Sequence, residues 1–345
     1  MPTDYGERIK DIPLYRPGKP PLTHFDADFL DELEKTWRRK WGSQSSYAKL
    51  RTVVVHRPGP EAAWGQADPQ FFNLPSGLLD LPRMQAQHAE FLKILNQNGV
   101  ETIPLNPSEP VVGTYGLPLR SATFCHETLP VRGGVIICRT AAAYKRGLEY
   151  YHSRRIGELG CPIVYTVHGK GFFESSNLVW LDKASAAVAI SQRTNVEGSR
   201  QVTAVLQDFG VTDVHLVHLP GPLNTRRSQT SGGGGAFHLD MVFGVAAPKL
   251  GVIYPQGVGY EFIDYLLHAK RFELIEIPEE EVNGCPSNLL VLEPGKLAIP
   301  AGNPVVSGEL RKRGLKVIEV ELGEFTKGGG GPTCMTLPLV RDDED

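Results

Sequence analysis

The sequence predicts an α/β protein in which one helix-to-strand unit recurs five times. Two observations support this prediction. A helical stretch, a turn and a short apolar strand recur at spacings of roughly 45 to 60 residues, and paired apolar strands lie between the copies. Such a repeat predicts either a cyclic array or a layered α/β domain. With 345 residues, 41% of them hydrophobic and 22% charged, the chain has an ordinary globular composition, and we expect a single folded domain.

The first part of the chain differs from the rest. Several prolines precede a short charged helix that is expected around Asp26 to Trp41. Regular structure is expected to begin with the apolar strand Thr52–Val55, which Pro58-Gly59 follows. We therefore predict an N-terminal extension over residues 1–48 and a single α/β domain over residues 49–345.

The five units follow one another in order. The first runs from the helix Ala86–Gln97 through the turn Asn98-Gly99 into the strand Thr102–Leu105. The strands of the later four units are expected at Ile163–Tyr165, Val214–Leu216, Leu274–Glu276 and Val317–Val320.

Paired strands are expected between the units. Asp182-Lys183 and Pro294-Gly295 are residue types that tight hairpin turns use. The expected strands are Val135–Cys138, Leu178–Leu181 with Ala187–Ile190, Met241–Val245 with Gly251–Tyr254, and Leu289–Leu292 with Lys296–Ile299.

Charge and cysteine content exclude several classes of protein. A net charge of −3 without a basic block gives no attraction to nucleic acid or to an anionic membrane. No stretch resembles a signal peptide or a membrane-spanning helix, so we expect a cytoplasmic protein whose partner is a small molecule. The five cysteines are odd in number and include no CxxC pair, which favours reduced thiols over a disulfide framework or a zinc site. A homo-oligomer is left open.

One cysteine stands directly beyond a glycine run. Gly328 to Gly331 are followed by Pro332, Thr333 and Cys334. Glycines have no side chains to pack and can adopt backbone angles closed to other residues, so we expect a mobile loop over a pocket. Cys334 is the first candidate nucleophile. The alternative is a small buried hydrophobic residue, which is the commoner role of cysteine.

A second glycine run precedes a histidine and an aspartate. Gly232 to Gly235 lead to His238 and Asp240 at the start of an expected strand. Residues two apart on a strand point to the same face, so both side chains could face one cavity. A histidine within reach would activate a thiol, and Asp240 would orient a cationic substrate. A solvated polar pair is the alternative.

Two glutamates are further candidates. Glu174 stands where Gly171 to Asn177 lead into an apolar strand, and Glu127 follows His126. Either carboxylate could instead only keep a turn or strand edge soluble. A metal site formed by His126, His238 and Asp240 lacks the usual ligand spacing.

The order of these segments resembles the guanidino-group-modifying, or pentein, superfamily, which includes arginine deiminases, dimethylarginine dimethylaminohydrolases and amidinotransferases. The resemblance runs from about residue 50 onward and is most specific at His238–Phe243 and Gly329–Leu339. It implies a five-bladed pseudo-symmetric α/β propeller of ββαβ blades around a central active site, and so makes residues 49–345 one catalytic domain. This agrees with the five units counted above.

The resemblance also implies roles for individual residues. Cys334 corresponds to the nucleophile, His238 to the general acid and base, Glu174 to the catalytic glutamate and Asp240 to a carboxylate that grips the guanidinium. Arg193 matches an arginine that reaches the substrate carboxylate in arginine deiminases, and Arg146 matches a second. A covalent thiouronium intermediate on Cys334 would then be hydrolysed by water that His238 activates.

The chain departs from the family pattern at three positions. Glu127 stands where many members have aspartate, Ser121 where arginine deiminases have asparagine, and Asn177 where the family usually has aspartate. All three are expected to contact the substrate. The longer Glu127 side chain changes the depth of the pocket, which argues against plain arginine deimination.

Three hypotheses follow. The first is a cysteine-dependent hydrolase of a C–N bond in a guanidino or amidino compound, working without a metal or an organic cofactor. The second is an amidinotransferase, which Glu174 disfavours because transferases of the family often have aspartate there. The third is a binding protein that has lost catalysis.

Overall fold

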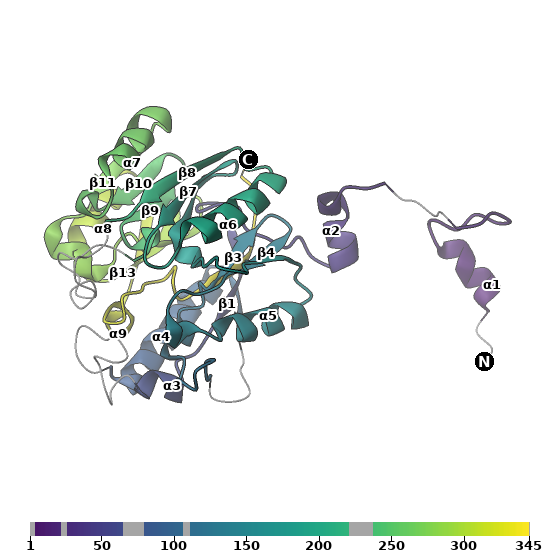
Figure 1. Ribbon diagram of the computed structural model, residues 1–345, viewed down its shortest axis with the longest axis horizontal. Helices are drawn as coiled ribbons and strands as arrows, with labels where there is room; N and C mark the ends of the chain where they lie inside the picture. The colour runs from purple at the N-terminus through teal and green to yellow at the C-terminus, as the bar shows by residue number, and fades with distance from the viewer. Residues whose placement is uncertain (1–3, 22–25, 65–78, 106–110, 221–236, 345) are drawn as a thin grey trace.

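The computed structural model describes residues 4–21, 26–64, 79–105, 111–220 and 237–344 (Figure 1). Its strands form five sheets of three strands each. The strands are β1 (Leu50–Val55), β2 (Glu101–Pro104), β3 (Thr128–Val131), β4 (Gly134–Ile137), β5 (Ile163–Thr166), β6 (Leu178–Asp182), β7 (Ser185–Ile190), β8 (Asp213–His218), β9 (Phe243–Ala247), β10 (Leu250–Ile253), β11 (Glu273–Glu276), β12 (Leu290–Glu293), β13 (Lys296–Pro300), β14 (Lys316–Val320) and β15 (Leu337–Arg341).

Every sheet repeats one connection pattern. The sheets are β3-β4-β5, β6-β7-β8, β9-β10-β11, β12-β13-β14 and β15-β1-β2. In each, the first strand pairs antiparallel with the middle strand, which pairs parallel with the third. Because a parallel pair needs a crossover, a helix separates the middle strand from the third in every blade. This confirms the predicted five-bladed α/β propeller of ββαβ units, with strand positions close to those expected.

The crossover helices cover the outside of the ring (Figure 1). They are α4 (Leu81–Gln97), α5 (Leu148–Glu158), α6 (Val196–Asp208), α7 (Tyr260–Asp264) with the π-helix Tyr265–Ala269, and α8 (Pro304–Lys312). Each places an apolar stripe against its sheet, as Phe91 and Leu95 of α4 do when they pack against Leu50 and Val53. The shorter helices are α1 (Tyr5–Arg8), α2 (Phe29–Trp37), α3 (Pro60–Ala63) and α9 (Gly323–Thr326), with 3₁₀ turns at Ile9–Asp11, Arg120–Thr123, Ala143–Lys145, Ser175–Asn177, Leu239–Met241, Pro255–Gly257 and Glu279–Gly284.

The last blade is assembled from both ends of the described ring. β15 pairs with β1 antiparallel, so that Val54 is opposite Leu337 and Val53 is opposite Pro338. The second and third strands of this blade come from the start of the domain and the first strand from its end. Ring closure therefore fixes the segment that carries Cys334.

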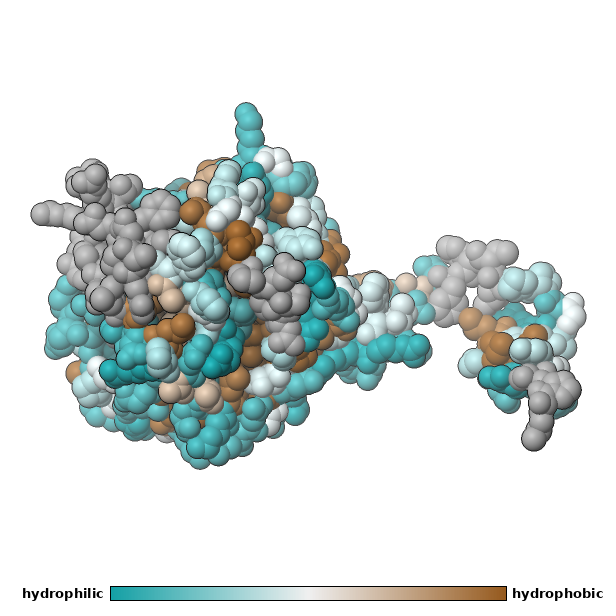
Figure 2. Space-filling view, turned by 90° about the horizontal axis from the view of Figure 1, so that it is seen from below, coloured by the Kyte–Doolittle hydropathy of each residue, from teal (hydrophilic) through white to brown (hydrophobic). Residues whose placement is uncertain are grey.

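The segment before β1 falls into two parts. Residues 4–21 are exposed throughout, and α1 lies apart from the main body (Figure 1), whose face in Figure 2 has hydrophobic residues among hydrophilic ones. Leu33 of α2 is buried, continuous burial begins at Trp41, and Gln44 donates to the backbone oxygens of Lys183 and Phe209. The boundary between residues 48 and 49 stays a proposal, with residues 41–48 packed against the ring.

Among the helices in the described part of the chain, none combines the length and the apolar character needed to cross a membrane. All five cysteines are free and buried.

Candidate active site

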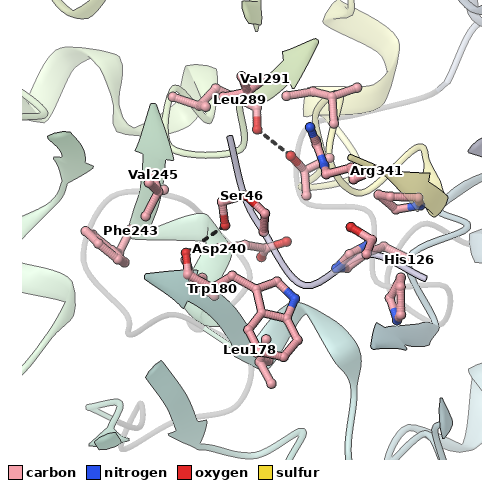
Figure 3. Close-up of a pocket in the computed structure, with 18 of the residues that line it drawn as sticks. Ser46, His126, Leu178, Trp180, Asp240, Phe243, Val245, Leu289, Val291 and Arg341 are labelled. Atoms are coloured by element: carbon pink, nitrogen blue, oxygen red, sulfur yellow. Dashed lines mark hydrogen bonds between the residues drawn. The ribbon is translucent and has the colours of Figure 1, made fainter. Parts of the chain in front are cut away.

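A central hollow is enclosed by the innermost strand of every blade. Its empty volume is about 650 Å³, part of it open to solvent. The lining residues come from β3, β6, β9, β12 and β15, and from the segment that contains Ser43, Ser45 and Ser46. Asp240 and His126 also line it (Figure 3). The ring thus brings residues from distant parts of the sequence to one axis.

Cys334 lies beside this axis and is held by a buried asparagine. Its Sγ is 3.0 Å from Nδ2 of Asn288, and its backbone N–H donates to Oδ1 of the same side chain at 3.1 Å. Oδ1 of Asn288 also accepts the N–H of Gly331 at 3.0 Å. Because Asn288 is fully buried, this one amide determines where the loop places the thiol.

Asp240 is in contact with the same thiol. The Sγ of Cys334 donates to Oδ2 of Asp240 at 3.6 Å, and Nδ2 of Asn288 donates to that oxygen at 3.0 Å. The other oxygen, Oδ1, is buried and accepts no hydrogen bond from the described residues. A buried acceptor without a partner is costly, so Oδ1 marks a position where a ligand N–H would be stabilised.

Burial and the Asp240 charge keep the thiol protonated. Desolvation, followed by the nearby Asp240 carboxylate, raises the pKa of Cys334 well above its ordinary value. The two hydrogen bonds from Gly331 and Asn288 act in the opposite direction but are weaker. In the empty site Cys334 is therefore a thiol rather than a thiolate.

His238 is paired with Glu174. Nε2 of His238 is 2.8 Å from Oε2 of Glu174, whose side chain is almost completely buried. Burial acts to raise the pKa of Glu174. The charge of Lys145 and the hydrogen bond from His238 outweigh this effect and hold that pKa well below its ordinary value. An ionised carboxylate only accepts hydrogen bonds, so Nε2 carries the proton and Nδ1 is available for proton transfer.

One expectation about this segment is wrong. His238 and Asp240 do not lie on a strand: His238 has extended backbone angles, a 3₁₀ turn follows over Leu239–Met241, and β9 begins only at Phe243. Leu239 N donates to Oδ1 of Asn177, which holds the turn. The turn, rather than strand alternation, brings the two side chains to the site.

His126 lies near both His238 and Asp240. Burial is the main cause that lowers the pKa of His126. The Asp240 carboxylate acts to raise this pKa, and His238 acts to lower it further.

Glu127 is paired with a lysine that the sequence interpretation left unassigned. Nζ of Lys145 lies 2.5 Å from Oε1 of Glu127 and 2.8 Å from Oε2 of Glu174. The other oxygen of Glu127, Oε2, is buried and accepts no hydrogen bond from the described residues. Burial raises the pKa of Glu127 to about 7, although the charge of Lys145 acts to lower it. Burial acts to lower the pKa of Lys145, but the charges of Glu127 and Glu174 raise it. Lys145 is therefore a cation bound between two carboxylates.

Ser121 and Asn177 differ in their surroundings. Ser121 is buried, and its Oγ makes no hydrogen bond with any described residue. Asn177 uses its whole amide within the protein: Nδ2 donates to Ser191 and Thr194, and Oδ1 accepts from Leu239. These contacts suit Asn177 to positioning the His238 turn rather than to holding a substrate, whereas Ser121 stays a candidate contact.

Arg193 extends the charged cluster and Arg146 lies at its edge. Nη2 of Arg193 donates to the hydroxyl of Tyr144 at 2.7 Å, and Nη1 is 4.0 Å from Oε1 of Glu174. The guanidinium also lies over the ring of Phe237, 4.9 Å from its centroid. Arg146 is half-buried, and its pKa is lowered mainly by desolvation, then by Arg139, with Glu174 among the groups that oppose the shift.

The second half of the glycine run before Cys334 is packed against the protein. Gly330 and Gly331 are buried, and a Cβ at Gly330 would collide with the ring of Phe124. At Gly330 the missing side chain permits this close approach of Phe124, whereas Gly329 is exposed, and the mobile loop expected over a pocket stays a prediction. The other run, Gly232–Gly235, lies outside the described residues.

Sequence reasoning missed two residues of the site. Asn288 directly precedes the expected strand Leu289–Leu292 and has no motif around it. Lys145 is adjacent to Arg146, so its place in the chain pointed to the site, but only the 3₁₀ turn Ala143–Lys145 reveals which of the two side chains is buried. Over the described residues, no group of three or more His, Cys, Asp or Glu side chains is arranged to hold a metal ion.

Comparison with known proteins places this geometry in context. A family model described as arginine deiminase matches residues 256–341, which include Cys334 and Asn288. DDAH from Pseudomonas aeruginosa, in a complex with citrulline, superposes with a TM-score of 0.66 at 22% identity, over 84% of this chain and 99% of that chain. SxtG, an amidinotransferase from Microseira wollei, superposes with a TM-score of 0.67 at 17% identity, over 88% and 98%.

The ring therefore has the pentein fold of these structural neighbours, and its C-terminal quarter matches arginine deiminases in sequence. Among its curated relatives, a 2-nitroimidazole nitrohydrolase from Mycobacterium sp. (strain JS330) is 25% identical over 363 aligned positions, covering 98% of this chain and 93% of that protein. Sequence similarity to this relative thus extends over the full ring as well as over the segment that contains Cys334.

Proposed function

We propose that this pentein is a cysteine-dependent hydrolase that cleaves a C–N bond at an amidine-type carbon, that is, a carbon bonded to at least two nitrogens. One observation carries the proposal. The Sγ of Cys334 lies 3.6 Å from Oδ2 of Asp240, and Oδ1 of that buried carboxylate accepts no hydrogen bond from the described residues. A ligand N–H bound to Oδ1 would bring its carbon close to the sulfur, as nucleophilic attack requires.

The proposed reaction has two steps. In the first, the sulfur of Cys334 bonds to the amidine-type carbon, and the bond from that carbon to the leaving group breaks. The thiol proton passes to the leaving group through His238, whose Nε2–H is held by Glu174. In the second, His238 takes a proton from water, the hydroxyl bonds to the carbon, and the sulfur leaves and regains its proton. The net reaction replaces the leaving group by oxygen.

The raised pKa of Cys334 limits when attack can occur. In the empty site the thiol is protonated, so it should react slowly with iodoacetamide near neutral pH and faster as the pH rises. Loss of the thiol proton would then accompany substrate binding. This predicts that substrate turnover and alkylation of the empty enzyme have different pH profiles.

Mass spectrometry of trapped enzyme tests the proposal. Protein is mixed with arginine derivatives, guanidino acids, agmatine and uncharged amidine-type heterocycles, quenched in acid and digested. An adduct on Cys334, with release of the leaving group, is the expected result. Cys161→Ser is the matched control, because Cys161 is a buried thiol in another part of the core and its loss should leave adduct formation unchanged.

The same experiment separates hydrolysis from amidino transfer. If turnover requires glycine, lysine or another added amine and the product carries the substrate carbon, the enzyme is a transferase. A hydrolase turns over without an amine and incorporates oxygen from labelled water. Absence of both turnover and adduct across the panel, with the protein folded, would refute the proposal.

A further inference from the structure

Lys145 occupies the position from which two carboxylates would otherwise hold a substrate cation. Its ammonium group lies 2.5 Å from Glu127 and 2.8 Å from Glu174, and its side chain is only 10% exposed. A guanidinium presents N–H donors around its whole edge and needs acceptors on several sides. In this site two of the three candidate carboxylates already bind a cation that belongs to the protein.

Cations of the protein already offset part of the negative charge of the site. Three carboxylates, Glu127, Glu174 and Asp240, face two permanent cations, Lys145 and Arg193. Lys145 is bound by Glu127 and Glu174, whereas Asp240 forms no ion pair with a lysine, arginine or histidine among the described residues. A guanidinium ligand would therefore find only Asp240 without a cation of the protein, whereas without Lys145 it could also pair with Glu127 and Glu174.

The atoms that lack partners fit an uncharged ligand. Oδ1 of Asp240 and Oε2 of Glu127 can each accept an N–H, and Oγ of Ser121 can donate or accept. An amidine-type heterocycle presents an N–H donor and a ring nitrogen acceptor on either side of the reactive carbon without a positive charge. The N–H of such a molecule can donate to Oδ1 of Asp240, and its ring nitrogen can accept from a hydroxyl such as that of Ser121, without displacing Lys145.

We infer that Lys145 is a resident counter-cation that selects an uncharged amidine-type substrate, such as a nitrogen heterocycle with a leaving group on the carbon between two nitrogens, over guanidinium cations. This inference rests on the proposed function for the reacting carbon, but the charge selection is a property of binding and can be measured without turnover. Lys145 acts as a positioning and specificity-determining residue.

Binding is measured in the Cys334→Ser background, where no covalent step occurs. The uncharged ligand is 2-nitroimidazole at slightly acidic pH, and the cationic ligands are arginine and agmatine. With Lys145 present, calorimetric titration is expected to give binding of 2-nitroimidazole at least about tenfold tighter than binding of either cation. Lys145→Ala should reverse the order, because Glu127 and Glu174 then need a cation.

Three further measurements guard against misfolding and general charge effects. Lys145→Arg keeps the charge and the fold, so it should keep the preference for the uncharged ligand. Adding methylammonium to Lys145→Ala should restore binding of 2-nitroimidazole, which a simply misfolded protein would not do. Lys93→Met removes an exposed lysine, and its effect on either ligand should be less than about twofold.

The possible outcomes separate the two proposals. Tighter binding of arginine or agmatine with Lys145 present, or no change of order in Lys145→Ala, would overturn the inference and leave the hydrolase proposal intact. Failure of both ligand classes to bind either protein would also overturn it. Preference for the uncharged ligand without any adduct on Cys334 in the unmodified enzyme would support the inference while refuting the hydrolase proposal.

Discussion

Asn288 is the residue whose replacement most directly tests how the site is held together. Its Oδ1 accepts the N–H groups of Gly331 and Cys334, and its Nδ2 donates to Asp240 and to the thiol. Asn288→Ala leaves both N–H donors buried and unpaired. Each costs about 1–3 kcal/mol, so the free energy of unfolding should fall by about 2–6 kcal/mol.

Asn288→Asp separates stability from thiol chemistry. The oxygen that accepts from Gly331 and Cys334 is kept, but the Nδ2 donor is replaced by an anionic oxygen about as close to the thiol as Nδ2 is now. A second negative charge near Cys334 disfavours the thiolate, so the pKa of Cys334 should rise further. Alkylation by iodoacetamide should then be slower at every pH up to the thiol pKa.

The assay combines urea unfolding with the pH dependence of alkylation. Asn303→Ala is the matched control: Asn303 is also fully buried and donates to Gly284 and Pro300, but it lies outside the site. The Asn303→Ala variant should have a lower free energy of unfolding and the same pH profile of Cys334 alkylation as the original protein. The reasoning fails if Asn288→Ala has the same free energy of unfolding as the original protein. It also fails if the pH profile of alkylation is the same in Asn288→Asp as in the original protein.

Three other predictions concern the thiol, a buried histidine and the glycine run. Cys334→Ser should abolish turnover while ligand binding, measured by calorimetry, is preserved. Burial lowers the pKa of His152 to about 3. Below a pH of about 6.5, His152 therefore binds a proton in the unfolded state but stays neutral in the folded state. Stability should therefore be lost as the pH falls, by about 2 kcal/mol from this group between pH 6.5 and 5, and His152→Gln should flatten that loss in urea unfolding. Gly330→Ala places a Cβ against Phe124 and should cost about 1–3 kcal/mol, which Phe124→Leu should partly restore in the double variant.

These predictions have their own controls and failures. His268→Gln changes an exposed histidine and should leave the acid dependence of stability unaltered. If His152→Gln keeps the full acid dependence, burial of that imidazole is not its cause. If Gly330→Ala costs nothing, or if Phe124→Leu does not compensate, the close approach of the ring to the glycine run is irrelevant to stability. Residual turnover in Cys334→Ser would assign the chemistry to another group.

The fold could be predicted from the sequence because its signals are local and repeated. Each unit carries its own apolar helix face, turn and short strand, and the hairpins at Asp182-Lys183 and Pro294-Gly295 have typical turn residues. The contacts within the site were less accessible. The 3₁₀ turn after His238 depends on a hydrogen bond from Leu239 to Asn177. A pairing between blades of that kind has no signature in either segment.

Lys145 illustrates the same limit more sharply. Adjacent basic residues in a sequence are usually both exposed, and nothing in the local pattern says which one enters the core. The structure buries Lys145 between Glu127 and Glu174, whereas Arg146 lies only half-buried beside it. The difference comes from the direction of one short turn, which tertiary packing decides.

The pairing of β15 with β1 has a consequence for the order in which the protein matures on the ribosome. Cys334 and the strand that docks it are synthesised after Glu127, Glu174, His238 and Asp240, so the nascent chain holds an open ring with β1 as an unpaired edge until Leu337–Arg341 emerge. Translation products that stop short of Cys334 would lack both the docking strand and the Cys334 thiol, and their exposed edge would make them natural clients for chaperones.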